Sequence, residues 1–119
     1  MAVHRTIVAA EASQGNAALT ARLLEAVGAV DDGVWIDVAG WFPFCFEING
    51  ITVATVQIRG SLAPTKPANT VHGFQVGANV TTTGSQNIAS LEPLRWVKAR
   101  VSAWTSGSID VDMISPGND

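Results

Sequence analysis

The chain has 119 residues, which is enough for one domain with a single hydrophobic core. Charged residues make up 14% of it and hydrophobic residues 47%, so few charges can cover the surface, and part of that surface is expected to meet a partner. The net charge is −3 and the seven basic residues are scattered, which argues against a nucleic-acid partner. No segment approaches the roughly 20 apolar residues that cross a bilayer, so no membrane partner is expected.

The two ends of the chain differ in composition from its centre. Residues 1–20 are rich in Ala, Ser, Gln, Gly and Asn and have weak periodicity, which predicts an extended N-terminal arm or an edge strand. Residues 21–115 are expected to form one β domain, and residues 116–119 a flexible tail. The first residues do not form a signal peptide, so we expect synthesis in a cytoplasm.

Residues 16–27 are compatible with two structures. Their leucines have helical spacing and Asn16 could cap a helix. The alternative is a strand over residues 22–27, followed by a turn at residues 31–33 and a second strand over residues 34–38. Both alternatives remain open at the level of sequence.

Large apolar residues recur at every second position in four segments, which are residues 42–48, 54–58, 97–103 and 109–113. This period of two is typical of half-buried strands. It predicts an all-β fold in which short strands form an antiparallel β-sandwich. Cys45, the one cysteine, alternates with these residues and is expected to be a buried thiol with a packing role.

Two glycine-containing segments are typical of hairpin turns. Asn49 and Gly50 lie between two strand patterns and suit a two-residue turn. Residues 105–107 suit a three-residue loop, because apolar residues then face apolar residues across the hairpin. This register places Arg100 opposite Asp112 and predicts a cross-strand ion pair.

Residues 64–69 are predicted to form a surface loop. Pro64 and Pro67 lack the N–H group that a central strand needs, so this stretch cannot continue a sheet. The loop, which also carries Lys66, is a candidate contact surface.

Three of the four tryptophans are candidate interface residues. Trp96 and Trp104 have the same parity as Lys98 and Arg100, so they are expected on the outer face of their strand. Trp41 and Trp104 could anchor a protein interface, where Trp is over-represented. The alternatives are partial burial under a loop or an edge strand, or stacking on sugar rings.

No group of residues predicts catalysis, a metal site or a cofactor. His4 and His72 are isolated from Cys and carboxylate residues at ligand spacing, and Cys45 lacks a histidine at a known nucleophile spacing. Asp110 and Asp112 could suggest an acid pair or half of a Ca²⁺ site, but the expected cross-strand pairing explains them. We therefore expect a binding protein without enzymatic activity.

Five segments follow one another in an order typical of one protein group, namely LLEAV (23–27), WIDVAG (35–40), FEINGI (46–51), ATVQIRGS (54–61) and PLRWVKARVSAWTSGSIDV (93–111). Over about three quarters of the chain, their order resembles that of small structural proteins of tailed bacteriophages. Such proteins are similar to the jelly-roll or β-sandwich cement proteins, also called decoration proteins, of phage capsids.

The resemblance implies a location and partners. Cement proteins lie on the outside of the virion as dimers or trimers and brace neighbouring subunits of the major capsid protein, without enzymatic activity or cofactor. Residues 1–20 would then reach a neighbour or the shell. Two other functions remain open: a tail, baseplate or head-to-tail joining subunit, and a carbohydrate-binding module in which Trp96 and Trp104 form a flat platform.

Overall fold

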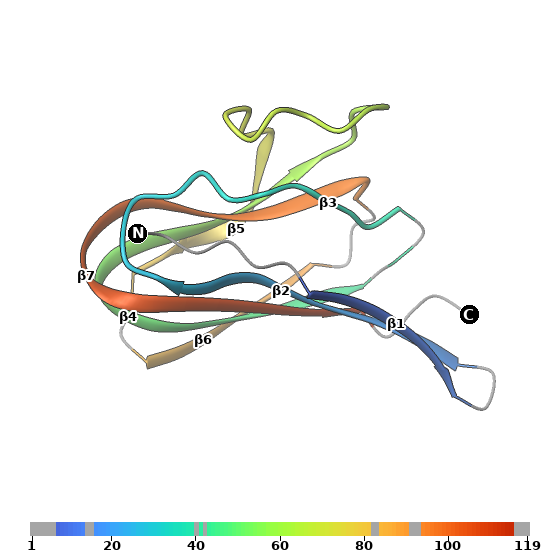
Figure 1. Ribbon diagram of the computed structural model, residues 1–119, viewed down its shortest axis with the longest axis horizontal. Helices are drawn as coiled ribbons and strands as arrows, with labels where there is room; N and C mark the ends of the chain where they lie inside the picture. Colours follow the sequence, from blue (N-terminus) through green and yellow to red (C-terminus); the bar gives the residue numbers. More distant parts are fainter. Residues whose placement is uncertain are drawn as a thin grey trace.

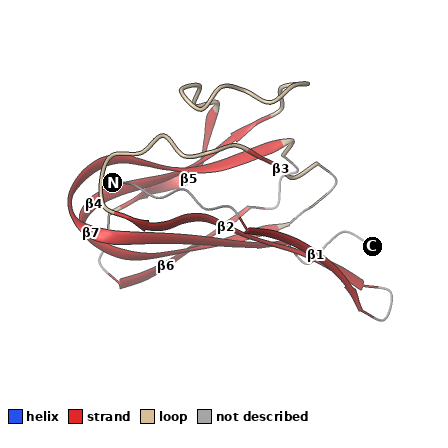
Figure 2. Ribbon diagram, viewed as in Figure 1, coloured by secondary structure: helices blue, strands red, loops and turns tan. Residues whose placement is uncertain are grey.

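The computed structural model describes residues 7–13, 16–39, 41, 43–81, 84–90 and 94–115. Within these ranges all regular elements are strands, so no helix there could cross a membrane (Figure 2). The strands are β1 (Ile7–Ser13), β2 (Asn16–Val27), β3 (Ile36–Asp37), β4 (Phe44–Ser61), β5 (Phe74–Val80), β6 (Gly84–Ser90) and β7 (Trp96–Ser115). The prediction of an all-β fold is confirmed.

The strands form one antiparallel sheet in the order β1-β2-β7-β4-β5, with β3 paired to β7 and β6 paired to β4. The long strands β4 and β7 pair along most of their length and curve back at one end of the molecule (Figure 1). The two halves of the sheet therefore face each other. We call the half that contains β1, β2 and β6 the lower layer, and the half that contains β3 and β5 the upper layer. The predicted β-sandwich and its jelly-roll-like arrangement stay predictions.

One cluster of buried apolar side chains joins the two halves of the sheet. β4 and β7 contribute Phe44, Phe46, Ile48, Ala54, Val56, Ile58, Val97, Ala99, Val101, Ile109, Val111 and Met113. These are the residues that the period of two predicts to be buried, with Ala103, which is exposed, as an exception. Phe42 lies outside the described residues.

The two predicted hairpins are wrong, because β4 runs through Gly50 and β7 runs through Gly107. Both glycines have a positive φ, and the register between the strands shifts beside each of them. A Cβ at Gly50 would overlap the carbonyl oxygen of Ser108, and one at Gly107 would lie 2.5 Å from the carbonyl oxygen of Gly50. The glycines thus permit β-bulges where the two strands approach closely and bend together.

The N-terminal part is a pair of strands. Residues 16–27 form β2, so of the two open structures the strand is correct and the helix is wrong. β1 pairs with β2 along its whole length, as an edge strand would. The predicted turn at residues 31–33 is not a regular turn, because Asp31 forms an isolated bridge with Val101 of β7, and the Gly33 N–H donates to Asp31 Oδ1 at 2.9 Å. Residues 1–6 of the expected arm and the expected tail at 116–119 lie outside the described residues.

The predicted pair of Arg100 and Asp112 is also wrong. Because β7 does not fold back on itself, Arg100 lies opposite Gln57 of β4, and Asp112 lies opposite Arg22 of β2. Arg22 donates to both carboxylate oxygens of Asp112, at 2.8 and 3.2 Å. Cys45 is exposed rather than buried, since it lies on the outer face of the lower layer.

Candidate interface loop

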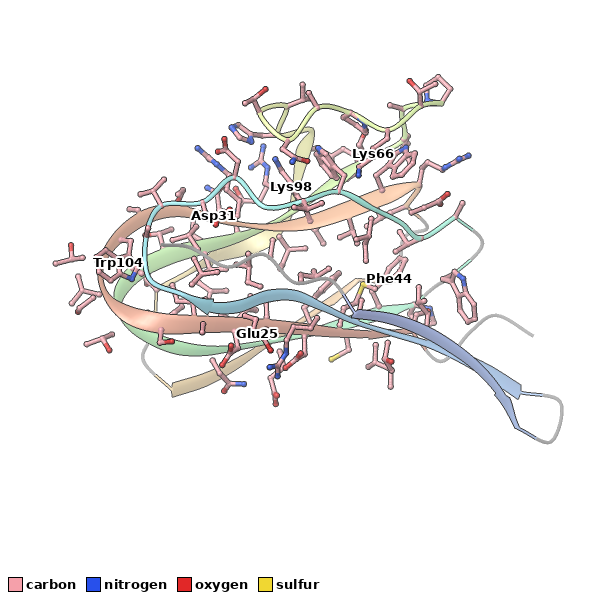
Figure 3. All side chains as sticks on the ribbon, viewed as in Figure 1. Glu25, Asp31, Phe44, Lys66, Lys98 and Trp104 are labelled. Carbon is pink, nitrogen blue, oxygen red and sulfur yellow. The ribbon has the colours of Figure 1, made fainter. Side chains whose placement is uncertain are left out.

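The segment from residue 62 to residue 73, which we call the clamped loop, connects β4 to β5 without forming a strand. It passes over the outer face of the upper layer, where Lys66 and Lys98 lie (Figure 3). The prediction of a surface loop at residues 64–69 is confirmed. Pro64 and Lys66 are exposed, and Pro67 is half-buried. Loops of this length without regular structure are commonly functional in compact domains.

Trp35, just before β3, and Trp96, at the start of β7, bind backbone carbonyls of the loop. The indole N–H of Trp96 donates to the carbonyl oxygen of Ala63 at 2.9 Å. The indole N–H of Trp35 lies 3.1 Å from the carbonyl oxygens of both Ala68 and Val71. These bonds hold the start and the middle of the loop, because each satisfies a backbone acceptor that has no partner in a sheet.

Lys98 is fully buried beneath the middle of the loop. Its ammonium group donates to the carbonyl oxygens of Asn69, at 2.7 Å, and Val71, at 2.9 Å. The same group lies 3.1 Å from His72 Nδ1 and 4.9 Å from the centroid of the Trp35 ring. A buried charge needs such a set of partners, because it has lost its hydration.

Arg59 holds the C-terminal end of the loop. Its Nε donates to the carbonyl oxygen of His72 at 2.8 Å, and its Nη2 donates to that of Gly73 at 3.2 Å. Its Nη1 lies 3.4 Å from the side-chain oxygens of Gln57 and Gln75. Trp35, Arg59, Trp96 and Lys98 together bind six carbonyl groups of the loop, so its backbone is held against the sheet at both ends and in the middle.

The charges around the loop favour a protonated lysine beside a neutral histidine at neutral pH. Burial lowers the pKa of Lys98 from 10.5 to about 8. Burial, and next the charge of Lys98, lower the pKa of His72. A neutral His72 can accept from Lys98 through Nδ1. Its Nε2 lies 3.8 Å from Asp32 Oδ1, which is also 3.6 Å from Arg100 Nε.

Large apolar side chains are exposed on and beside the clamped loop. Leu62 is 68% exposed, Val71 49% and Phe74 41%. Because the loop backbone is bonded to the sheet, little conformational freedom remains to be lost when a partner covers these side chains. Such a surface is suited to binding another protein.

Of the alternatives for Trp96, burial under a loop is correct. Trp96 is 8% exposed, so a position on an open outer face is wrong. The loop covers that face of β7, which is why Lys98 is buried as well. Trp41 and Trp104 are half-buried and pack against the core, and Trp104 donates from its indole N–H to the carbonyl oxygen of Gly107 at 3.0 Å.

A groove lies on the outer face of the lower layer, on the other side of the molecule from the clamped loop. It is an open groove of about 600 Å³, lined by Thr20, Ala21, Arg22, Cys45, Glu47, Asp112, Met113 and Ile114. Asp112 lies opposite Glu47 of β4 as well as Arg22 of β2. The Arg22 guanidinium pairs with Asp112 and also lies 3.4 Å from Glu25 Oε1 on its own strand. Among the described residues, no three His, Cys, Asp or Glu side chains gather closely enough to hold a metal ion.

The chain matches no protein-family model, no curated protein and no solved structure. The residues that clamp the loop were not found from the sequence. A lysine at an alternating position beside arginine is typical of a solvated face, and nothing local indicates that a loop 27 or more residues away covers it. The one signal was the pair of prolines, which predicts the loop but not the site on which it packs.

Proposed function

We propose that this chain is a structural subunit of a tailed-phage virion without enzymatic activity, made in the host cytoplasm and placed on the capsid exterior. It would brace neighbouring subunits of the major capsid protein as a dimer or trimer. The resemblance of residues 23–114 to cement proteins supports the proposal. The all-β fold is compatible with it.

One observation carries the proposal, namely a loop held by four buried or half-buried side chains, with Leu62 and Val71 exposed on it and Phe74 exposed beside it at the start of β5. A cement subunit must bury apolar area at joints of the shell, and many identical contacts multiply a modest energy per site. Pro64, Lys66 and Pro67 would lie in the same contact. Trp41 and Trp104 are partly exposed and remain proposed anchors.

The carbohydrate-binding alternative is less well supported. A sugar platform would need Trp96 and Trp104 side by side on an open face, and Trp96 is covered with its N–H bonded to Ala63. A tail, baseplate or joining subunit would use the same kind of contact but would assemble into rings or tubes. Electron microscopy of the isolated chain and of the intact particle distinguishes that location from the capsid.

The test is co-sedimentation of the purified chain with capsids that lack it. We expect saturable binding in a fixed ratio to the major capsid protein. The double variant Leu62→Asp, Val71→Asp should weaken binding by at least about tenfold, because charge is placed in an apolar contact. Ile114→Asp is the matched control, since Ile114 is 46% exposed and lies in the groove on the outer face of the lower layer, whereas the loop lies on the upper layer. A wild-type chain that stays in the supernatant contradicts the proposal.

A further inference from the structure

β1 forms an open edge of the lower layer. Among the described strands it contacts β2 alone, and it pairs with β2 over all seven of its residues without a register shift. Among the described residues the ladder between β2 and β7 begins at Leu19, and residues 16–18 of β2 pair there with β1 alone. Figure 1 shows this end as a two-stranded ribbon that projects beyond the body of the molecule. An isolated two-stranded ribbon is marginally stable in water, so a third strand would stabilise it.

The other outer strands are less suited to pairing. β3 has two residues. β5 contains Gly77 with a positive φ, and its register with β4 shifts between Val56 and Ile58. β6 contacts β5 as well as β4. β1 therefore offers the longest regular edge with a single neighbour.

The sequence of β1 lacks the features that usually protect an edge strand. Natural edges are commonly blocked by lysine, proline, a bulge or a covering loop. β1 reads IVAAEAS, with no lysine, arginine or proline and with Glu11 as its one charged residue. An edge of this kind is a template for another strand.

We propose that β1 pairs with β1 of a second copy of this chain, in an antiparallel two-fold dimer with a sheet continuous across both subunits. Centred on Ala10, the pairing places Glu11 of each copy opposite Ala9 of the other. The two glutamates are then not directly opposite each other, so the like charges do not oppose the pairing. A two-fold axis makes the contact self-complementary and closed, with the same strand used on both sides. This inference deepens the proposed function, on which it rests for its biological role.

The backbone geometry identifies the residues that would make the contact. In an antiparallel strand, alternate residues direct their N–H and C=O groups to opposite sides. A two-residue hairpin connection closes on a hydrogen-bonded pair, here Ser13 with Asn16, so the groups of Val8, Ala10 and Ala12 are directed to the free edge. Proline at position 10 would remove the central outward donor and leave the bonds to β2 in place.

The experiment is sedimentation velocity over a concentration series. We expect wild type and the control Ala10→Val to form dimers, and Ala10→Pro to dissociate at least about tenfold more readily. Amide hydrogen exchange of wild type gives an independent readout if the proline variant does not fold. The amides of Val8, Ala10 and Ala12 should be protected in the dimer and lose protection on dilution.

The inference would be overturned by a monomeric wild type, by a proline variant that folds and dimerises as well as wild type, or by exchange at β1 that does not depend on concentration. A trimer or open ring would exclude the two-fold pairing, and protection that appears only with capsids would identify a shell strand as the partner. Capsid co-sedimentation separates the two proposals. A monomer that binds capsids contradicts the edge pairing alone, and a β1-paired dimer that never binds them contradicts the capsid role alone.

Discussion

The clamped loop and the ribbon of β1 and β2 are held to the same sheet in opposite ways. The loop has few backbone bonds of its own, and its carbonyls are satisfied by the side chains of Trp35, Arg59, Trp96 and Lys98. The ribbon is held by a backbone ladder and leaves one edge of that ladder open. A segment without regular structure can thus be held along its length by side chains beneath it, while a segment of regular strand is held by its ladder to one neighbour.

The bend at Gly50 and Gly107 separates the layers that carry these two regions. We expect a substitution there to lower the free energy of unfolding more than any other change considered below. We expect Gly50→Ala to lower the free energy of unfolding by roughly 3 kcal/mol, because the backbone has a positive φ there and the added Cβ would overlap the Ser108 carbonyl. Chemical denaturation measures this change.

The matched control is Gly28→Ala. At Gly28 a Cβ would make ordinary contacts, the nearest 3.7 Å from the Trp104 ring, and its φ is not positive. We expect a change within about 0.5 kcal/mol. Equal stabilities of the two variants would show that the close approach of β4 and β7 does not define the bend.

Removing the Lys98 charge should destabilise the loop and leave the ribbon of β1 and β2 unchanged. We expect Lys98→Met to lower the free energy of unfolding by roughly 2 kcal/mol, because the carbonyl of Asn69 loses its donor and that of Val71 loses one of two. Amide exchange should accelerate in residues 62–73 and stay unchanged in β1 and β2. Lys66→Met, an exposed position on the same loop, is the control and should change little.

The same variant tests the titration of Lys98. Burial lowers its pKa from 10.5 to about 8, so between these values the unfolded chain holds a proton that the folded chain has released. The free energy of unfolding of wild type should therefore rise with pH across this window. Lys98→Met should lack that rise, and an identical pH dependence of the two proteins would contradict the burial of an ionisable group here.

We expect the smallest loss of stability from protonation of His72, and we expect it in the loop. The pKa of His72 is lowered from 6.5, so the stability that neutral His72 contributes is present above pH 6.5 and is lost as the pH falls through the folded value. Protonation places an imidazolium beside the Lys98 ammonium. We expect the protection of the loop amides, measured relative to their intrinsic exchange rates at each pH, to fall at low pH, and His72→Gln, which keeps an acceptor, should show less of this loss. An equal loss of protection in both proteins would exclude His72 as its cause.

The amino-acid pattern was enough to predict which residues of β4 and β7 face the core, with Ala103 as an exception, because a period of two is a local property that burial on one face enforces. It also determined the loop at residues 64–69, since two prolines cannot pair in a sheet. Whether Gly50 and Gly107 form hairpin turns or β-bulges depends on which strand lies opposite them, because a positive φ suits both structures. The sequence does not contain that pairing. For the same reason the partners of Arg100, Asp112 and Lys98 depended on long-range pairing and on the position of the loop, which no local pattern contains.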